Sequence, residues 1–384
     1  MRRIAVTMAM ATMVMACGEE AVDDPQADGP EVAEFKAALP SRAALEAPAV
    51  TADASTRAVG DLAMFPASSL GLVEGVNGTV GWVVDLLEAV TELPPTIYNS
   101  DSDEYVWGPF ENDDGPGFVS VYIRRNPASD DFEFTYAFLR GIGRDLANTT
   151  AVIVGGATPI DTENDDPSTS EDNEFGEGSL FVDFDADRAF DEEFDPNFDS
   201  AASDRGKFVA IFGKGPDEDD PEQINSVVIA AFRDFSSAND PSAPIDLDYL
   251  YGTVETDEFS AGFLNYRIPI DITEGEDGAL EDTEVHLAFV NEGFGRAEVT
   301  ASGGSLGSDE EVTGLECWGD DFDRTYLNLS TNVEGGYSYS EGTVEGCQAP
   351  FDLPLDELDV PSLADIPQDD FNALADLAEN GLDG

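Results

Sequence analysis

The sequence is poor in positive charge. It has 17 Lys and Arg against 82 Asp and Glu, a formal net charge of −65 at pH 7, and its only lysines are Lys36, Lys207 and Lys214. Binding of nucleic-acid phosphates, like electrostatic docking to anionic lipid, needs clustered Lys and Arg. We therefore expect no nucleic-acid partner and no binding to membranes through charge.

The excess of acidic residues has three interpretations. It can keep the protein soluble in a salty habitat, where counterions screen the self-repulsion; it can bind divalent cations; or it can steer a cationic partner. The scarcity of lysine favours the first interpretation.

Histidine is nearly absent, which limits the catalytic and metal chemistry. The single His286 cannot form a zinc site by itself. Residues 303–307 (GGSLG) match the G-x-S-x-G pattern of serine hydrolases, but that pattern requires a following helix and a later histidine. Because His286 precedes Ser305, we expect Ser305 to lie in a glycine-rich turn and His286 to be an ordinary strand residue.

The N-terminus has the layout of a secretory signal. Arg2 and Arg3 precede 13 uncharged residues, Ile4 to Ala16, a stretch too short to span a bilayer, which needs about 20. We expect no other segment of the chain to span a membrane. The stretch ends in Val14-Met15-Ala16-Cys17, which resembles the lipobox of bacterial lipoproteins.

This resemblance implies that residues 1–16 are a signal peptide and that Cys17 becomes the acylated N-terminus. The chain as a whole is similar to predicted lipoproteins of Gram-negative bacteria. In that family, a residue other than Asp after the cysteine, here Gly18, implies routing to the outer membrane, facing the periplasm or the cell surface. The acyl chains would then bind the protein stably to the membrane.

Cysteine is also scarce, with three residues in the chain. With Cys17 acylated, Cys317 and Cys347 remain as a pair in an oxidising compartment, and we expect them to form one disulfide. A loop of that size would contribute about 3–4 kcal/mol to stability.

The composition divides the chain into segments. Residues 17–57 are rich in Ala, Pro, Asp and Glu, and we expect them to be a disordered acidic tether. Residues 58–350 are expected to form one β domain with a helix at about 68–92, capped by Ser68 or Ser69. The apolar face of this helix favours packing in the core over a membrane-surface or partner-binding role. Residues 351–384 are expected to be an acidic tail with a short helix.

Alternation of apolar and polar residues predicts many antiparallel strands, for example at residues 119–123 and 132–138. The expected fold is therefore mainly β: a single large antiparallel domain, barrel-like or a sandwich, closed or nearly closed, with about 10–13 strands. Its recurring aromatic residues would fill the interior or flank a helix lodged there.

Two acidic strings begin like the Ca²⁺ loop of an EF-hand. In the first, Arg188 and Phe194 replace the required Gly and Glu; in the second, Gly206 replaces the final Glu. Both an ordered Ca²⁺ and a solvated acidic loop remain open, and we expect no other cofactor. The candidate Ca²⁺ ligands are Asp183, Asp185, Asp187, Asp195, Asn197 and Asp199.

These observations predict a non-enzymatic envelope or surface lipoprotein that acts as a binding or structural module. One alternative is a carboxylate-dependent hydrolase of envelope or extracellular polymers, but 82 acidic residues offer no way to choose a catalytic pair. A second is a transmembrane β-barrel. Asp246 and Asp248, on alternating strand positions, favour a water-facing surface instead.

Overall fold

The structure is a computed structural model, and the statements below concern the residues that it describes. The signal peptide, Cys17 and the helix expected in the C-terminal tail lie outside them. The described residues are 30–47, 63–112, 115–128, 132–159, 175–217, 220–237, 244–256, 259–272, 279–290, 293–320, 322–333 and 335–367.

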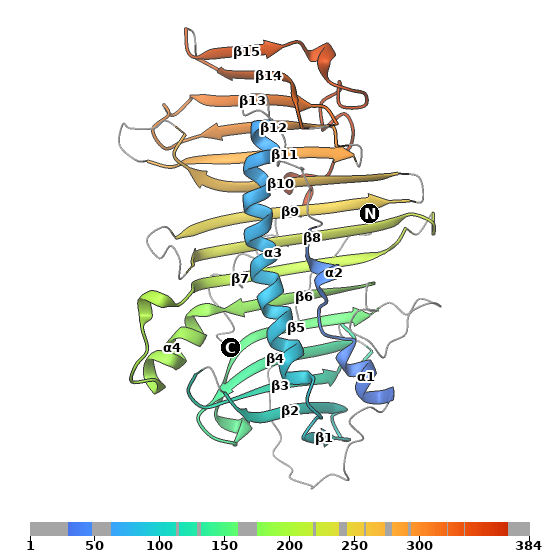
Figure 1. Cartoon of the computed structure of the whole chain (residues 1–384), viewed down its shortest axis with the longest axis vertical. Coiled ribbons are helices and arrows are strands. Elements are labelled where there is room, and N and C mark those ends of the chain that lie inside the picture. Colours follow the sequence, from blue (N-terminus) through green and yellow to red (C-terminus); the bar gives the residue numbers. More distant parts are fainter. Residues whose placement is uncertain are drawn as a thin grey trace.

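The chain forms one antiparallel sheet of 15 strands, in which every strand pairs with its neighbours in sequence (Figure 1). The strands are β1 (Ile97–Asn99), β2 (Glu104–Glu111), β3 (Phe118–Arg125), β4 (Phe134–Gly141), β5 (Thr149–Pro159), β6 (Gly176–Asp183), β7 (Arg205–Pro216), β8 (Ile224–Ser236), β9 (Ile245–Glu255), β10 (Ser260–Ile270), β11 (Glu281–Val290), β12 (Gly295–Ser302), β13 (Glu311–Trp318), β14 (Arg324–Thr331) and β15 (Ser338–Gly342).

The predicted antiparallel β architecture is confirmed, but the predicted closure and the predicted number of strands are wrong. The sheet is open, with β1 and β15 at its two edges, and it is not one half of a sandwich. Alternation along a strand shows that one face is buried, but not what covers that face. Here a helix covers it, so the sheet does not have to fold onto itself to bury its apolar side chains.

That helix is α3 (Met64–Thr91), which confirms the helix expected at about 68–92. It crosses the strands on one face, which we call the inner face, with its N-terminal end near β12 and β13 and its C-terminal end near β2 and β3 (Figure 1). With 28 residues it is about 42 Å long.

By length and composition alone, α3 could also cross a membrane, contrary to the expectation that no such segment follows the leader. One side of it nevertheless packs in the core. Val80, Val83, Val84 and Leu87 are fully buried against the inner face of the sheet.

Aromatic side chains of the inner face flank this helix, one of the two arrangements expected from the sequence. Trp107, Tyr136, Phe208 and Tyr249 belong to the same buried cluster as the valines of α3. The main core of the described residues therefore lies between α3 and the sheet.

Part of the expected tether is folded. Residues 30–47 contain α1 (Pro30–Lys36) and α2 (Arg42–Leu45), which lie beside α3 on the inner face (Figure 1). Phe35 and Leu45 are buried, and the ring of Phe35 lies 4.8 Å from that of Tyr105. The expectation of a tether over 17–57 is thus wrong for residues 30–47. A few apolar side chains are enough to fold a polar segment when they can be buried against an existing core.

The opposite, outer face is partly covered by the C-terminal strap, which we define as residues 351–366. Phe351 and Leu355 of the strap are buried against Ala288 and Val290 of β11. Residues 351–366 of the expected acidic tail therefore belong to the folded domain.

Candidate functional site

The first candidate site consists of the acidic residues 183–199. They include α4 (Phe184–Phe194), a helix that the sequence pattern did not predict. Asp183 caps this helix by accepting the backbone N–H of Ala186 at 2.8 Å, and Asp185 accepts the N–H of Gly206 at 3.1 Å.

Asp187 forms an ion pair with the buried Arg140, which also bonds Asp191 at 2.7 Å. Burial raises the pKa of Asp187, against the opposing effect of the Arg140 guanidinium. The two aspartates and Arg140 hold α4 on the end of β4. This is a sufficient structural role for both carboxylates.

The second acidic string caps its own turns. Asp195 accepts the N–H of Asn197, and Asp199 accepts that of Ala201. Within the described ranges, no group of three or more His, Cys, Asp or Glu is arranged to hold a metal ion. The structure therefore does not bring the six Ca²⁺ candidates together.

Ser305 and His286 are also far apart. The backbone N–H of Ser305 donates to Glu281 at the start of β11, whereas His286 lies five residues further along that strand, a separation of about 17 Å. His286 faces the strap, where its Nε2 donates to the carbonyl of Pro361 at 3.1 Å. Ser305 thus lies in a turn and His286 in a strand, as expected, and the two residues form no catalytic pair.

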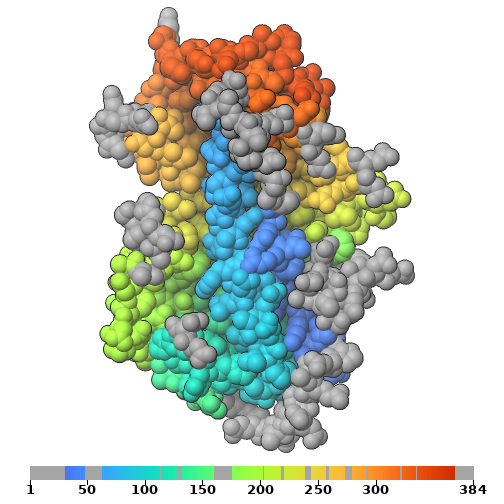
Figure 2. Space-filling view, in the orientation of Figure 1, coloured from blue at the N-terminus to red at the C-terminus, as the bar shows by residue number. Residues whose placement is uncertain are grey.

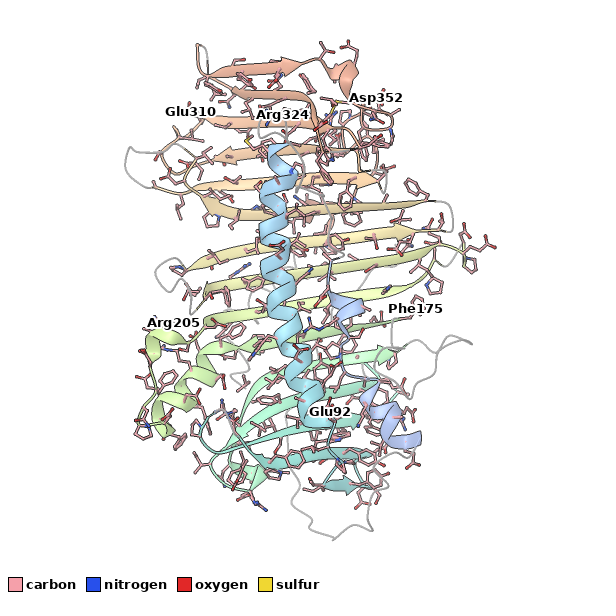
Figure 3. All side chains as sticks on the ribbon, in the orientation of Figure 1. Glu92, Phe175, Arg205, Glu310, Arg324 and Asp352 are labelled. Carbon is pink, nitrogen blue, oxygen red and sulfur yellow. A yellow bond between two sulfur atoms is a disulfide. The ribbon has the colours of Figure 1, made fainter. Side chains whose placement is uncertain are left out.

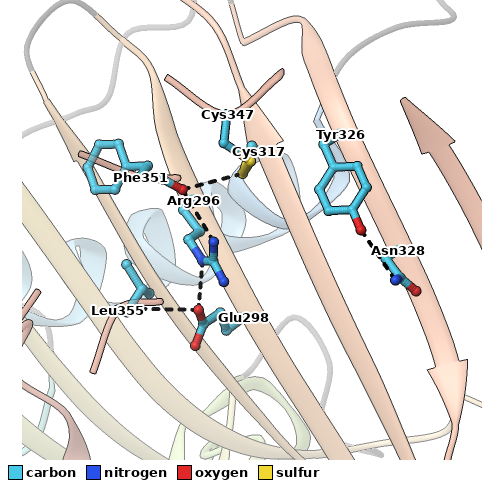
Figure 4. Close-up of a disulfide and its surroundings, with 8 residues drawn as sticks. All are labelled: Arg296, Glu298, Cys317, Tyr326, Asn328, Cys347, Phe351 and Leu355. Atoms are coloured by element: carbon cyan, nitrogen blue, oxygen red, sulfur yellow. Dashed lines mark hydrogen bonds and ion pairs between the residues drawn. A yellow bond between two sulfur atoms is a disulfide. The ribbon is translucent and has the colours of Figure 1, made fainter. Parts of the chain in front are cut away.

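The predicted disulfide is confirmed between Cys317 and Cys347, with a Cα–Cα distance of 5.4 Å. It lies on the outer face where the strap begins (Figure 4). Next to it, Arg296 donates to the carbonyl of Phe351 and Glu298 accepts the N–H of Leu355. The disulfide and these bonds bind the strap to the sheet.

An apolar groove of about 960 Å³ lies on the inner face among the described residues. One wall is the N-terminal half of α3, from Met64 to Thr79, and the other consists of side chains of β8 to β14. Figure 2 shows α3 as a ridge exposed along this side of the molecule. A ligand pocket typically has a volume of about 300–1,000 Å³ and a mainly apolar lining, so the groove has the size and character of a binding site.

Glycines of α3 create the space. A Cβ at Gly71 or Gly75 would meet no atom within 4 Å, and both positions line the groove. Leu72 and Val76, next to them in sequence, also line the groove. Residues three and four apart share one helix face, so these glycines leave a strip of bare backbone along the groove.

Polar groups in the groove are few. Tyr266 is buried, and its hydroxyl lies 3.1 Å from that of Ser69; burial raises the pKa of Tyr266. Asp271 lies between Ile270 and Ile272, which line the groove and are both 39% exposed. These two isoleucines and Asp271 form what we call the groove rim.

A buried carboxylate fixes this rim. Glu281 is fully buried and accepts the N–H of Ile272 and the N–H of Ser305, both at 2.8 Å. Leu306, next to Ser305, also lines the groove. Glu281 thus joins two loops at the groove, and the glycine-rich turn of Ser305 is one of them.

Comparison of the chain with protein-family models, with curated proteins and with solved structures finds no match. The groove itself was missed by reasoning from the sequence. Its one signal was the spacing of Ser68, Gly71, Gly75 and Thr79, small residues on one face of an apolar helix. That spacing alone does not distinguish a groove from a close helix contact.

Proposed function

We propose that this protein is a non-enzymatic, lipid-anchored envelope protein whose folded domain binds an apolar ligand in the groove beside α3. The groove carries the proposal. It combines about 960 Å³ of space with an apolar lining, and burial of apolar surface contributes about 25 cal/mol per Å² to binding.

The rigid surroundings of the groove support a binding role. One wall is a helix of 28 residues that is anchored in the main core, and the other is a continuous sheet. A preformed site avoids part of the entropic cost of ordering on binding.

The anchoring part of the proposal depends on the leader and on Cys17. A protein with a net charge of −65 is repelled by anionic bilayers, so acyl chains are the attachment that fits its composition. We place the protein at the outer membrane, facing the periplasm or the cell surface, with the membrane as its partner through these chains.

The binding proposal is tested with diphenylhexatriene, an uncharged rod-shaped dye that fluoresces in apolar surroundings. We expect the full-length Cys17→Ser chain, which carries no acyl chain of its own, to bind the dye. The double variant Gly71→Leu/Gly75→Leu fills the groove and should abolish the fluorescence. Leucine favours a helix by nearly 1 kcal/mol per site over glycine, so this variant is expected to fold.

Gly78→Leu is the matched control. Gly78 is also a helical glycine at which an added Cβ would meet no atom within 4 Å, but it does not line the groove. The control variant should bind the dye like the parent. Equal binding by the parent and the double variant would refute the groove as the binding site, and no binding by the parent would refute the proposed function.

A further inference from the structure

The groove is long. Along α3, the 15 residue steps from Met64 to Thr79 correspond to about 22 Å. On the other side, the lining comes from the seven consecutive strands β8 to β14, which at the usual spacing extend about 29 Å. A volume of about 960 Å³ distributed over this length accommodates an extended chain better than a compact ring system.

The described part of the lining contains no positive charge. Among the described residues that line the groove, Asp271 is the only charged one, and the polar remainder consists of hydroxyl groups such as those of Tyr266, Thr283 and Thr331. An ionised carboxylate or phosphate buried without a counter-charge is strongly unfavourable. Hydroxyls, in contrast, can bond the ester, ether or alcohol oxygens of an uncharged molecule.

The position of Asp271 adds a second barrier to anions. It belongs to the groove rim, between two half-exposed isoleucines, and the neighbouring Ile272 is held by the buried Glu281. A negatively charged headgroup at the rim would therefore meet the Asp271 carboxylate, next to a residue whose backbone Glu281 holds in place.

We propose that the ligand is an uncharged long-chain lipid, and that Asp271 determines specificity by excluding amphiphiles with anionic headgroups. This inference rests on the proposed function and names the class of ligand for the same groove. The hydrocarbon chain lies lengthwise between α3 and the strands, and the headgroup lies at the rim.

The test compares two competitors that have the same hydrocarbon chain. Monopalmitoyl glycerol and palmitate, each below its micellar concentration at pH 8, are titrated against diphenylhexatriene bound to the full-length Cys17→Ser chain. We expect monopalmitoyl glycerol to displace the dye and palmitate to be weaker by about tenfold or more.

Asp271→Asn should reduce this difference and Asp271→Lys should abolish or invert it. Asp282→Lys is the charge-matched control, because Asp282 lies on β11 with a side chain 64% exposed and does not line the groove. It should leave the ratio of the two affinities unchanged.

The outcomes separate the two proposals. If the dye binds and the Gly71→Leu/Gly75→Leu variant blocks it, but palmitate competes as well as monopalmitoyl glycerol, the inference about the ligand is wrong and the binding function stands. A ratio that does not respond to Asp271→Lys would overturn the role of Asp271. Failure of the dye to bind the parent chain would instead count against the proposed function.

Discussion

The carboxylate of Glu316 on β13 accepts the backbone N–H of Phe65 at 2.8 Å, although 251 residues separate the two in sequence. Its other oxygen accepts the N–H of Met64 at 2.8 Å, so one side chain caps the first turn of α3. Arg324 on the next strand donates to the same carboxylate at 2.7 Å and lies near this end of the helix (Figure 3). The helix that forms one wall of the groove is thus fixed at its N-terminus by the far end of the sheet.

Replacing Glu316 by Gln should therefore destabilise the protein. The side chain is fully buried, and the variant removes the nearer of the two carboxylates that Arg324 faces. Breaking a buried ion pair costs about 3–5 kcal/mol, and we expect about 3 kcal/mol, because Arg324 keeps Glu341 at 3.5 Å. The midpoint of urea unfolding measures this loss.

Glu341→Gln is the control for that measurement. Like the Glu316 variant, it removes one carboxylate that is paired with Arg324. The Glu341 side chain is 53% exposed, however, and exposed ion pairs contribute only about 0–1 kcal/mol to stability. Equal effects of the two variants would show that the capping of α3 does not depend on Glu316.

His286 should make the stability of the protein depend on pH. Burial lowers its pKa in the folded protein, against the opposing effect of the nearby Glu298 carboxylate. The unfolded chain then takes up a proton at a higher pH than the folded chain, near pH 6.5. The stability due to neutral His286 is complete above this pH and is lost as the pH falls towards the folded pKa.

His286→Gln isolates this effect, because Gln can still donate to the carbonyl of Pro361 but does not titrate. We expect the free energy of unfolding of the wild type, relative to the variant, to decrease between pH 7.5 and pH 5.5. The chain has no other histidine. A difference between the two proteins that stays constant over this range would contradict the lowered pKa.

The strands and α3 could be predicted because their signals are local. Residues such as Val119, Val121 and Ile123, or Val76, Val80 and Val83, repeat with the period of a strand or of a helix. The start of α3 could not be predicted in the same way. Its cap is Glu316, which is distant in sequence, so the nearby Ser68 and Ser69 suggested a start four residues too late.

The candidate site was predictable only in part. The disulfide followed from the even pair of cysteines, whereas the groove depends on which faces of seven strands meet one side of α3. Asp271 is one of 82 acidic residues, and only its position at the rim distinguishes it from the others.

Removal of the disulfide should loosen the strap. The double variant Cys317→Ala/Cys347→Ala opens the loop between two residues that lie 30 positions apart in the sequence. We expect the free energy of unfolding to fall by about 3–4 kcal/mol. The strap keeps its bonds to Arg296 and Glu298, so the sheet should remain folded. Limited proteolysis should cut the variant between residues 347 and 366 faster than the wild type, and equal rates would argue against this role of the disulfide.

Membrane attachment should depend on Cys17 alone. The wild type is expected to incorporate labelled palmitate and to sediment with membranes even after a high-salt wash, since acyl chains and not charges would hold it. Cys17→Ser should incorporate no label and remain in the soluble fraction, while Cys317→Ala/Cys347→Ala should sediment like the wild type. Among the described residues, α3 is the one helix long and apolar enough to be an alternative anchor. Sedimentation of Cys17→Ser with the membranes after the wash would therefore contradict the lipid anchor and indicate that α3 attaches the protein to the membrane.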